Sequence, residues 1–295
     1  MNQNETHTTP RRRILVGVDG SEDGLRAVRY ATREAQAGGA DVWIVHAVDE
    51  GAPIAGLWDI VSSQEALLHA GEAAVAEALA VVAELGLPAD RVAAEVVVGH
   101  PGDVLADLTN KAMLLVLGRR SLSGAERMFV GSTSVAAAGR AACPMIVISA
   151  ASTPHQTGGL RTVAVAVSTW PVHPSALEWG VQEAALRKAQ LRIVHVVPEN
   201  LGIEGPRFVA AANACLAEQL DPLRKRHPEQ SVEVEVLLGD PVQSLIEVSK
   251  TVDLLIVGVH HDRAVLGGPV RALISHSHCP VGLIKPATTG ASIPK

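Results

Sequence analysis

One stretch of the sequence combines glycines and hydroxyl residues in a way that suits phosphate binding. Gly118 ends an apolar run, Ser121 follows it, and Gly131, Ser132 and Thr133 open a predicted helix. Glycine lets the backbone approach a ligand closely, and the first amides of a helix offer N–H groups to an anion. A tight turn would use the same residue types, so the stretch alone leaves a structural role equally open.

A second candidate group is the carboxylate of Asp19, which ends the first apolar run of the chain. In an open parallel α/β sheet, ligands bind beyond the carboxyl ends of the strands, where the strand order reverses. Asp19 would face a ligand there, or it would cap the helix that follows. Arg119 and Arg120, directly after Gly118, could reach a triphosphate or lie in a solvated loop.

Other patterns that carry chemistry are absent from the sequence or weak. It contains no GxxxxGK[ST] motif, no GxGxxG after the first strand and no nucleophile elbow. No general base has an evident positioned partner, so the sequence predicts slow hydrolysis of a bound ligand at most. We expect structural roles for His46 and His195. We also expect no metal site, because adjacent histidines seldom converge on one ion. The residues considered for such a site are His260, His261, Asp262, His276, His278 and Cys279.

The chain of 295 residues is an imperfect internal duplication. Equivalent residues recur at spacings of 149 from His46 to His195, 140 from Gly118 to Gly258 and 136 from Cys143 to Cys279. Each half is long enough to bury a core of its own. We therefore predict two domains, residues 1–153 and 160–295, joined by a linker in the Ser-, Thr- and Gly-containing segment 150–159.

In both halves, short runs of Val, Ile and Leu alternate with longer Ala-rich stretches. This alternation is typical of an α/β fold in which a parallel sheet is covered by helices on both faces. We expect strands near 14–18, 42–47, 92–98, 113–118 and 145–149, and again near 162–167, 191–196, 232–238, 253–258 and 281–285. Helices are expected over about 21–37, 62–85, 101–111 and 131–141 in the first half.

The composition restricts the classes of binding partner and the cellular compartment that we expect. The net charge is −6 and aromatic residues make up 2% of the chain, which argues against nucleic acid or an anionic membrane as a main partner. Residues 1–10 are polar and show no signal peptide. The Ala-rich stretch 65–87 carries Glu72, Glu77 and Glu84, which we take to exclude a membrane span. We expect a cytoplasmic protein.

Several short motifs together resemble the universal stress protein family in its tandem-domain form. They are GVDGS at 17–21, VHAV at 45–48, GHP at 99–101, CPMIVI at 143–148 and the glycine stretch that begins at Gly118, in which Ser121 replaces the family's second glycine. The resemblance implies two doubly wound domains, each with a five-stranded parallel sheet in the order 3-2-1-4-5. It also implies a homodimer or a pairing of the two halves through the fifth strands.

The resemblance further implies a stress-response regulatory module that binds ATP or a related adenine nucleotide, with or without Mg²⁺. By the same resemblance Asp19 contacts the ribose and the main chain of Ala47 contacts adenine. The phosphate-binding residues it implies are Gly118, Ser121, Gly131, Ser132 and Thr133.

The second half departs from this pattern at the ligand-facing positions. Ser168 stands where Asp19 is, and a loop shortened by four residues would align Gly267-Gly268-Pro269 with 131–133. Proline lacks an amide donor, so this half is predicted to bind ATP poorly. Two alternatives remain open for the whole chain: a nucleotide-free interaction scaffold, which Ser121 favours, and a weak ATPase.

Overall fold

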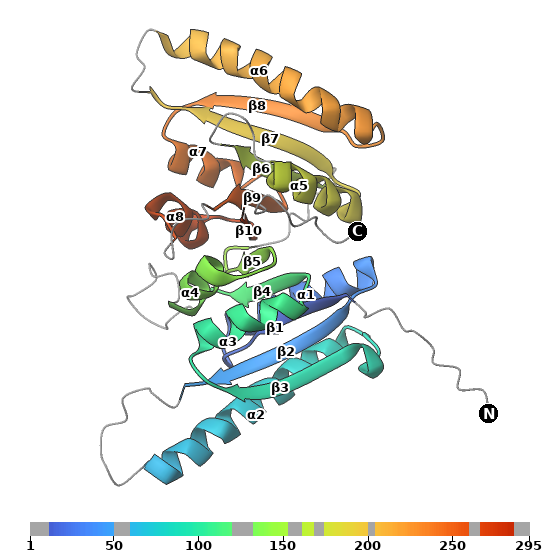
Figure 1. The fold of residues 1–295 in the computed structure, drawn as a ribbon, viewed down its shortest axis with the longest axis vertical. Helices are drawn as coiled ribbons and strands as arrows, with labels where there is room; N and C mark the ends of the chain where they lie inside the picture. Colours follow the sequence, from blue (N-terminus) through green and yellow to red (C-terminus); the bar gives the residue numbers. More distant parts are fainter. Residues whose placement is uncertain are drawn as a thin grey trace, which may run out of the picture.

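Strands from both halves form one continuous sheet of ten strands in the order β3-β2-β1-β4-β5-β10-β9-β6-β7-β8 (Figure 1). The computed structural model describes residues 12–49, 60–119, 132–152, 161–167, 174–199, 204–259 and 266–285. Each half has the predicted order 3-2-1-4-5 with parallel neighbours, which confirms the doubly wound α/β class.

The strand positions agree closely with those expected from the apolar runs. The first half contains β1 (Arg13–Gly17), β2 (Asp41–Val48), β3 (Val92–Val98), β4 (Leu114–Gly118) and β5 (Met145–Ile148). The second half contains β6 (Thr162–Val167), β7 (Gln190–Val197), β8 (Val232–Leu238), β9 (Leu254–Gly258) and β10 (Val281–Ile284).

Helices follow the strands in the same sequence in both halves. They are α1 (Glu22–Gly38), α2 (Ile60–Glu84), α3 (Pro101–Leu108) and α4 (Ser132–Arg140), then α5 (Pro174–Arg187), α6 (Gly205–Arg226), α7 (Pro241–Val248) and α8 (Gly268–His276). Short 3₁₀ turns occupy Ala89–Arg91 and Thr109–Lys111. The helix expected over 101–111 is therefore shorter, because its last turn tightens to 3₁₀ geometry.

Local sequence explains where several helices begin and end. Ser21 caps α1, since its Oγ accepts the N–H of Gly24 at 3.1 Å, and Gly39 ends that helix with φ +69°. Pro101 and Pro241 stand at the first position of α3 and α7, where their missing N–H costs nothing. These ends place the strand-to-helix turns at the carboxyl edge of the sheet.

The core lies on both faces of the sheet, because residues alternate sides along each strand. On β1, Ile14 and Val16 join the cluster under α1 and α2, whereas Leu15 joins the cluster under α3 and α4. Both clusters continue into the second half, where α5 and α6 cover the first face and α7 and α8 the second. The result is a three-layer arrangement that runs through the whole molecule.

The two halves meet at the centre of the sheet, where β5 pairs with β10 in antiparallel fashion (Figure 1). The register sets Val281 opposite Val147 and Leu283 opposite Met145. The helices α2 and α6 lie at opposite ends of the molecule. The expected pairing of the halves through their fifth strands is thus present within one chain.

A buried polar cluster joins α1 to α5 across the same boundary. Arg187 donates to Glu34 at 2.6 Å, to the hydroxyl of Tyr30 at 2.5 Å and to the carboxylate of Glu183. Trp179 donates its indole N–H to Glu183 at 2.8 Å. Two acids and one arginine share this site, and burial raises the pKa of Glu34 to about 7.

Helix α2 carries the Ala-rich stretch in which three glutamates seemed to exclude a membrane span. By length and composition alone, its residues 65–84 are long and apolar enough to cross a membrane, so the glutamates do not exclude one. In the structure α2 packs on β2 and β3, and Ala78 and Val82 lie in the core. Packing against the sheet accounts for the apolar face of this helix.

Candidate functional site

A cavity of about 440 Å³ opens at the carboxyl ends of β1, β2 and β4. This is the switch point of the first half, where β1 has β2 on one side and β4 on the other. Asp19, Ala47, Gly118 and Thr133, which come from four separate segments of sequence, line the cavity together. Of the other predicted residues, Ser121 and Gly131 lie outside the described residues, and Ser132 begins α4.

The carboxylate of Asp19 is held in place by the cap of the following helix. Its Oδ1 accepts the backbone N–H of Ser21 at 3.1 Å and the hydroxyl of Ser21 at 2.5 Å. The sequence left a ligand role and a capping role open for Asp19. The structure shows that Asp19 supports the cap residue and faces the cavity at the same time.

Gly118 is required by packing as well as by its position beside the cavity. A Cβ placed there would lie 2.4 Å from the carbonyl carbon of Asp23 and 2.6 Å from the N of Gly24. The first turn of α1 therefore rests directly on the end of β4. Asp23 is buried beside this contact; burial raises its pKa, and the guanidinium of Arg26, 2.6 Å away, opposes that rise.

Histidines near the ends of β2 and β7 have the same structural role in the two halves. His46 Nδ1 lies 2.9 Å from the carbonyl oxygen of Val18, and His195 Nδ1 lies 2.8 Å from that of Val167. A carbonyl can only accept, so Nδ1 carries the proton in both rings. Each histidine ties the end of its strand to the end of the central strand, as expected.

Arg119 and Arg120 are the two arginines considered for triphosphate binding. Arg119 donates Nη1 to the carbonyl oxygen of Ser275 in α8, so its guanidinium is directed to the second half. Arg120 lies outside the described residues. Positive potential in the described part of the cavity comes instead from the first turn of α4, a helix of nine residues.

Besides His46, three polar residues of the cavity were not assigned to it from the sequence: Asp49, His100 and Ser134. Ser134 is 3% exposed and sits in the first turn of α4. His100 precedes α3, and its part in the GHP motif was a signal that could have placed it at this edge. All three follow strands or open helices at the carboxyl side of the sheet.

The described lining offers groups for a ligand with hydroxyl and phosphate groups rather than a set of metal ligands. Asp19 offers a carboxylate to hydroxyl donors, and the α4 amides offer N–H groups to phosphate. Within the described residues, no group of three or more His, Cys, Asp or Glu side chains is placed to hold a metal. A Mg²⁺ ion would therefore need phosphate oxygens among its ligands, with Asp19 or Asp49 as the nearest protein carboxylates of the cavity lining.

The helix starts settle the alignment of the two glycine stretches. Helix α8 begins at Gly268 and α4 at Ser132, a separation of 136 residues that equals the separation of Cys279 from Cys143. The shortened loop is therefore the correct alignment. Pro269 then takes the place of Thr133 in the first turn, and its amide donor is lost.

Comparison with known proteins identifies the family. The model described as the universal stress protein family matches residues 10–149 and again residues 159–285. This chain belongs to the universal stress protein family. The two matches correspond to the two halves of the duplication, so the tandem form expected from the motifs is confirmed.

Curated universal stress proteins resemble the chain over nearly its full length. A universal stress protein of Mycobacterium bovis is 27% identical over 278 residues, which cover 90% of this chain and 92% of the relative. One from Mycolicibacterium smegmatis is also 27% identical, with 92% of this chain and 97% of the relative covered. A universal stress protein structure from Archaeoglobus fulgidus shares the fold, with a TM-score of 0.67 at 16% identity over 93% of this chain and 98% of its own.

Proposed function

We propose that this universal stress protein binds ATP or a related adenine nucleotide in its first half and acts as a regulatory module in a stress response. The observation that carries the proposal is the convergence of Asp19, Ala47, Gly118 and Thr133 on one cavity at the switch point. The family assigns these positions to ribose, adenine and phosphates. The nucleotide is the signal in this scheme.

The cavity supports a specific placement for each part of the nucleotide. Ribose hydroxyls lie against Asp19, which Ser21 holds in position. Adenine lies beside the main chain of Ala47, and the phosphates lie toward Gly118 and the first turn of α4. Slow hydrolysis stays an alternative, for which we propose no residue that would activate water.

Calorimetric titration of ATP onto the wild type and Asp19→Asn tests the assignment. The amide keeps an oxygen to accept from Ser21 but loses the charge, so ATP binding weakens by about tenfold to a hundredfold. Ser168→Ala, at the equivalent position of the second half, serves as the matched control and leaves binding unchanged. Undiminished binding in Asp19→Asn and Asp19→Ala would contradict the site, and absence of any titration by ATP, AMP or cAMP would favour the nucleotide-free scaffold.

Two further expectations belong to this proposal. As part of this proposal we place the protein in the cytoplasm. We also propose a homodimer; since β5 already pairs with β10, two chains would have to associate through another surface. Sedimentation velocity of the full chain distinguishes a dimer from a monomer.

A further inference from the structure

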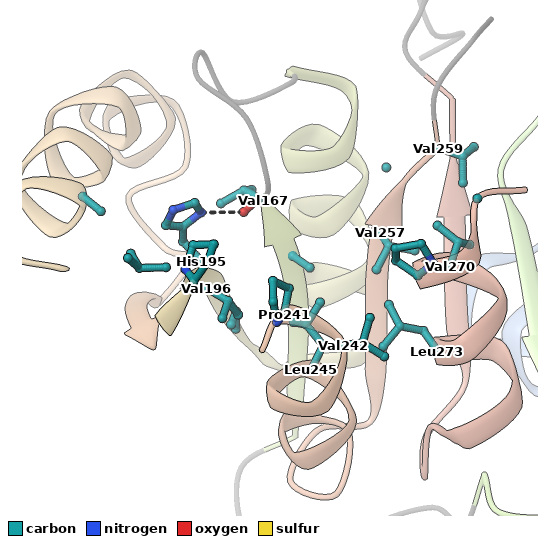
Figure 2. Close-up of a pocket in the computed structure, with 18 of the residues that line it drawn as sticks. Val167, His195, Val196, Pro241, Val242, Leu245, Val257, Val259, Val270 and Leu273 are labelled. Carbon is teal, nitrogen blue, oxygen red and sulfur yellow. Dashed lines mark hydrogen bonds between the residues drawn. The ribbon is translucent and has the colours of Figure 1, made fainter. Parts of the chain in front are cut away.

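The second half contains a larger cavity, of about 750 Å³, at the carboxyl ends of β6, β7 and β9 (Figure 2). It occupies the place in this half that the nucleotide cavity occupies in the first half. Side chains from α6, α7 and α8 complete its walls, and Ala138 and Gly139 from the last turns of α4 border it. Its volume lies within the ~300–1,000 Å³ typical of small-molecule sites.

Three polar positions of the first cavity are apolar in the second, whereas His46 corresponds to another histidine, His195. The residue 149 positions after Asp49 is Pro198, and those 136 positions after Thr133 and Ser134 are Pro269 and Val270. All three replacements line the second cavity. The change therefore affects side chains that would face a ligand, while the strands behind them keep their apolar pattern.

The described lining of the second cavity contains no Lys, Arg, Asp or Glu. Figure 2 shows Val196, Pro241 and Leu245 toward the left and Val257, Val270 and Leu273 toward the right. His195 lines the same cavity beside Val196, with its Nδ1 hydrogen-bonded to the carbonyl oxygen of Val167. A charged ligand would lose its hydration here with no opposite charge in the described lining to replace it.

We propose that this cavity is a second ligand site, separate from the nucleotide site, that binds an uncharged and mainly hydrocarbon small molecule. Burial of apolar surface on the ligand and on the cavity walls supplies the affinity. Phe208, which is 48% exposed on α6, lies at the cavity and becomes covered when the ligand binds. The duplication has thus produced two cavities of opposite chemistry.

Fluorescence of N-phenyl-1-naphthylamine, an uncharged apolar probe, tests the proposal on the full chain. The probe's emission rises on binding, and dodecan-1-ol displaces it. Dodecanoate, which differs in its charge, displaces it about tenfold less well or worse, and ATP does not displace it. No rise in emission, or displacement by ATP at the concentrations that fill the nucleotide site, would overturn the proposal.

A matched pair of substitutions on α6 locates the probe. Ala211 lines the cavity and Ala210 does not, and both are exposed, so Ala211→Glu and Ala210→Glu place the same carboxylate one residue apart without disturbing the core. Ala211→Glu weakens probe binding by about fivefold or more, whereas Ala210→Glu leaves it unchanged. Equal affinities in the two variants would place the probe elsewhere and overturn the assignment.

Cys215 gives an independent readout, because it is exposed on α6 and lines the same cavity. Burial raises the pKa of both other cysteines, Cys143 and Cys279, to about 12, so their thiols stay protonated and react slowly. N-ethylmaleimide should therefore label Cys215 first, as peptide mass spectrometry can show. Dodecan-1-ol slows that labelling at least about threefold and ATP does not; an unchanged rate with dodecan-1-ol would count against occupancy of the cavity.

Discussion

At the residue scale, single positions serve both the fold and the candidate nucleotide site. Asp19 faces the cavity while its Oδ1 accepts from Ser21, and Gly118 borders the cavity while α1 rests on it. Both residues were predicted from the sequence, because a strand end in a parallel sheet is where ligands bind. Ser134 and His100 were not assigned to the site from the sequence. Their positions depend on how α3 and α4 pack together, and the positions of the strand ends do not predict that packing.

Gly118→Ala should destabilise the protein by about 1–3 kcal/mol, since the new Cβ would overlap backbone atoms that cannot rotate away. Gly258→Ala is the matched control at the equivalent position. No atom of a described residue lies within 4 Å of a Cβ there, so its effect should stay within about 0.5 kcal/mol. Urea unfolding of both variants measures the difference. Equal losses of unfolding free energy in the two variants would show that the contact of α1 with β4 does not explain why residue 118 is a glycine.

At the element scale, apolar runs and periodicity predicted the strand positions and the helices of the first half, because the inner strands are buried on both faces and the helices on one. The contact between α1 and α5 was not predicted. It needs Glu34 and Arg187 to meet across 153 residues, and their proximity follows from the antiparallel pairing of β5 with β10. Sequence periodicity reports which face is buried, but not which helix covers it.

Removal of the arginine from this cluster should be costly. Arg187→Met leaves two carboxylates in a site where all three side chains are 12% exposed or less. We expect a loss of about 3–5 kcal/mol at neutral pH, because one partner of a buried ion pair is left uncompensated. Arg226→Met, which breaks an exposed pair with Glu178, should cost less than about 1 kcal/mol. A similar cost for both variants in urea unfolding would contradict the structural importance of the cluster.

The same cluster predicts a pH dependence of stability. Burial raises the pKa of Glu34 from 4.5 to about 7, so between these values the folded state holds a proton that the unfolded chain releases. This contribution to stability is complete below about pH 4.5 and is lost as the pH rises through about 7. Arg187, Glu183 and Arg161 are the charged groups that act on Glu34.

Glu34→Gln should therefore flatten the fall in unfolding free energy between about pH 5 and pH 8. Glu77→Gln, on the exposed side of α2, should keep the wild-type profile. Denaturant titrations across this range give the two profiles. A Glu34→Gln profile as steep as that of the wild type would assign the dependence to other groups.

At the scale of the whole molecule, the duplication has joined two doubly wound sheets into one by pairing β5 with β10. The order within each half was predicted from the family resemblance, and the structure confirms it. The continuity of the sheet and of both core layers could not be derived from either half alone. It depends on which edge strand of each half pairs with the other half. Domain boundaries at 153 and 160 stay predictions.

The joined sheet predicts how an isolated half behaves. Residues 1–153 alone would expose the β5 edge, whose backbone groups pair with β10 in the full chain. We expect the isolated half to form a dimer through β5, as measured by size-exclusion chromatography with light scattering. Circular dichroism first checks that it is folded. A folded monomer would show that the edge alone does not drive association.

One fold, repeated twice in this chain, thus carries one proposed nucleotide site and one proposed apolar site. Equilibrium dialysis of radiolabelled ATP against the full chain tests it most directly, because the number of bound nucleotides counts the competent halves. We expect saturation at one ATP per chain, with no decrease when dodecan-1-ol is present. Saturation at two ATP per chain, or competition between ATP and dodecan-1-ol, would contradict it.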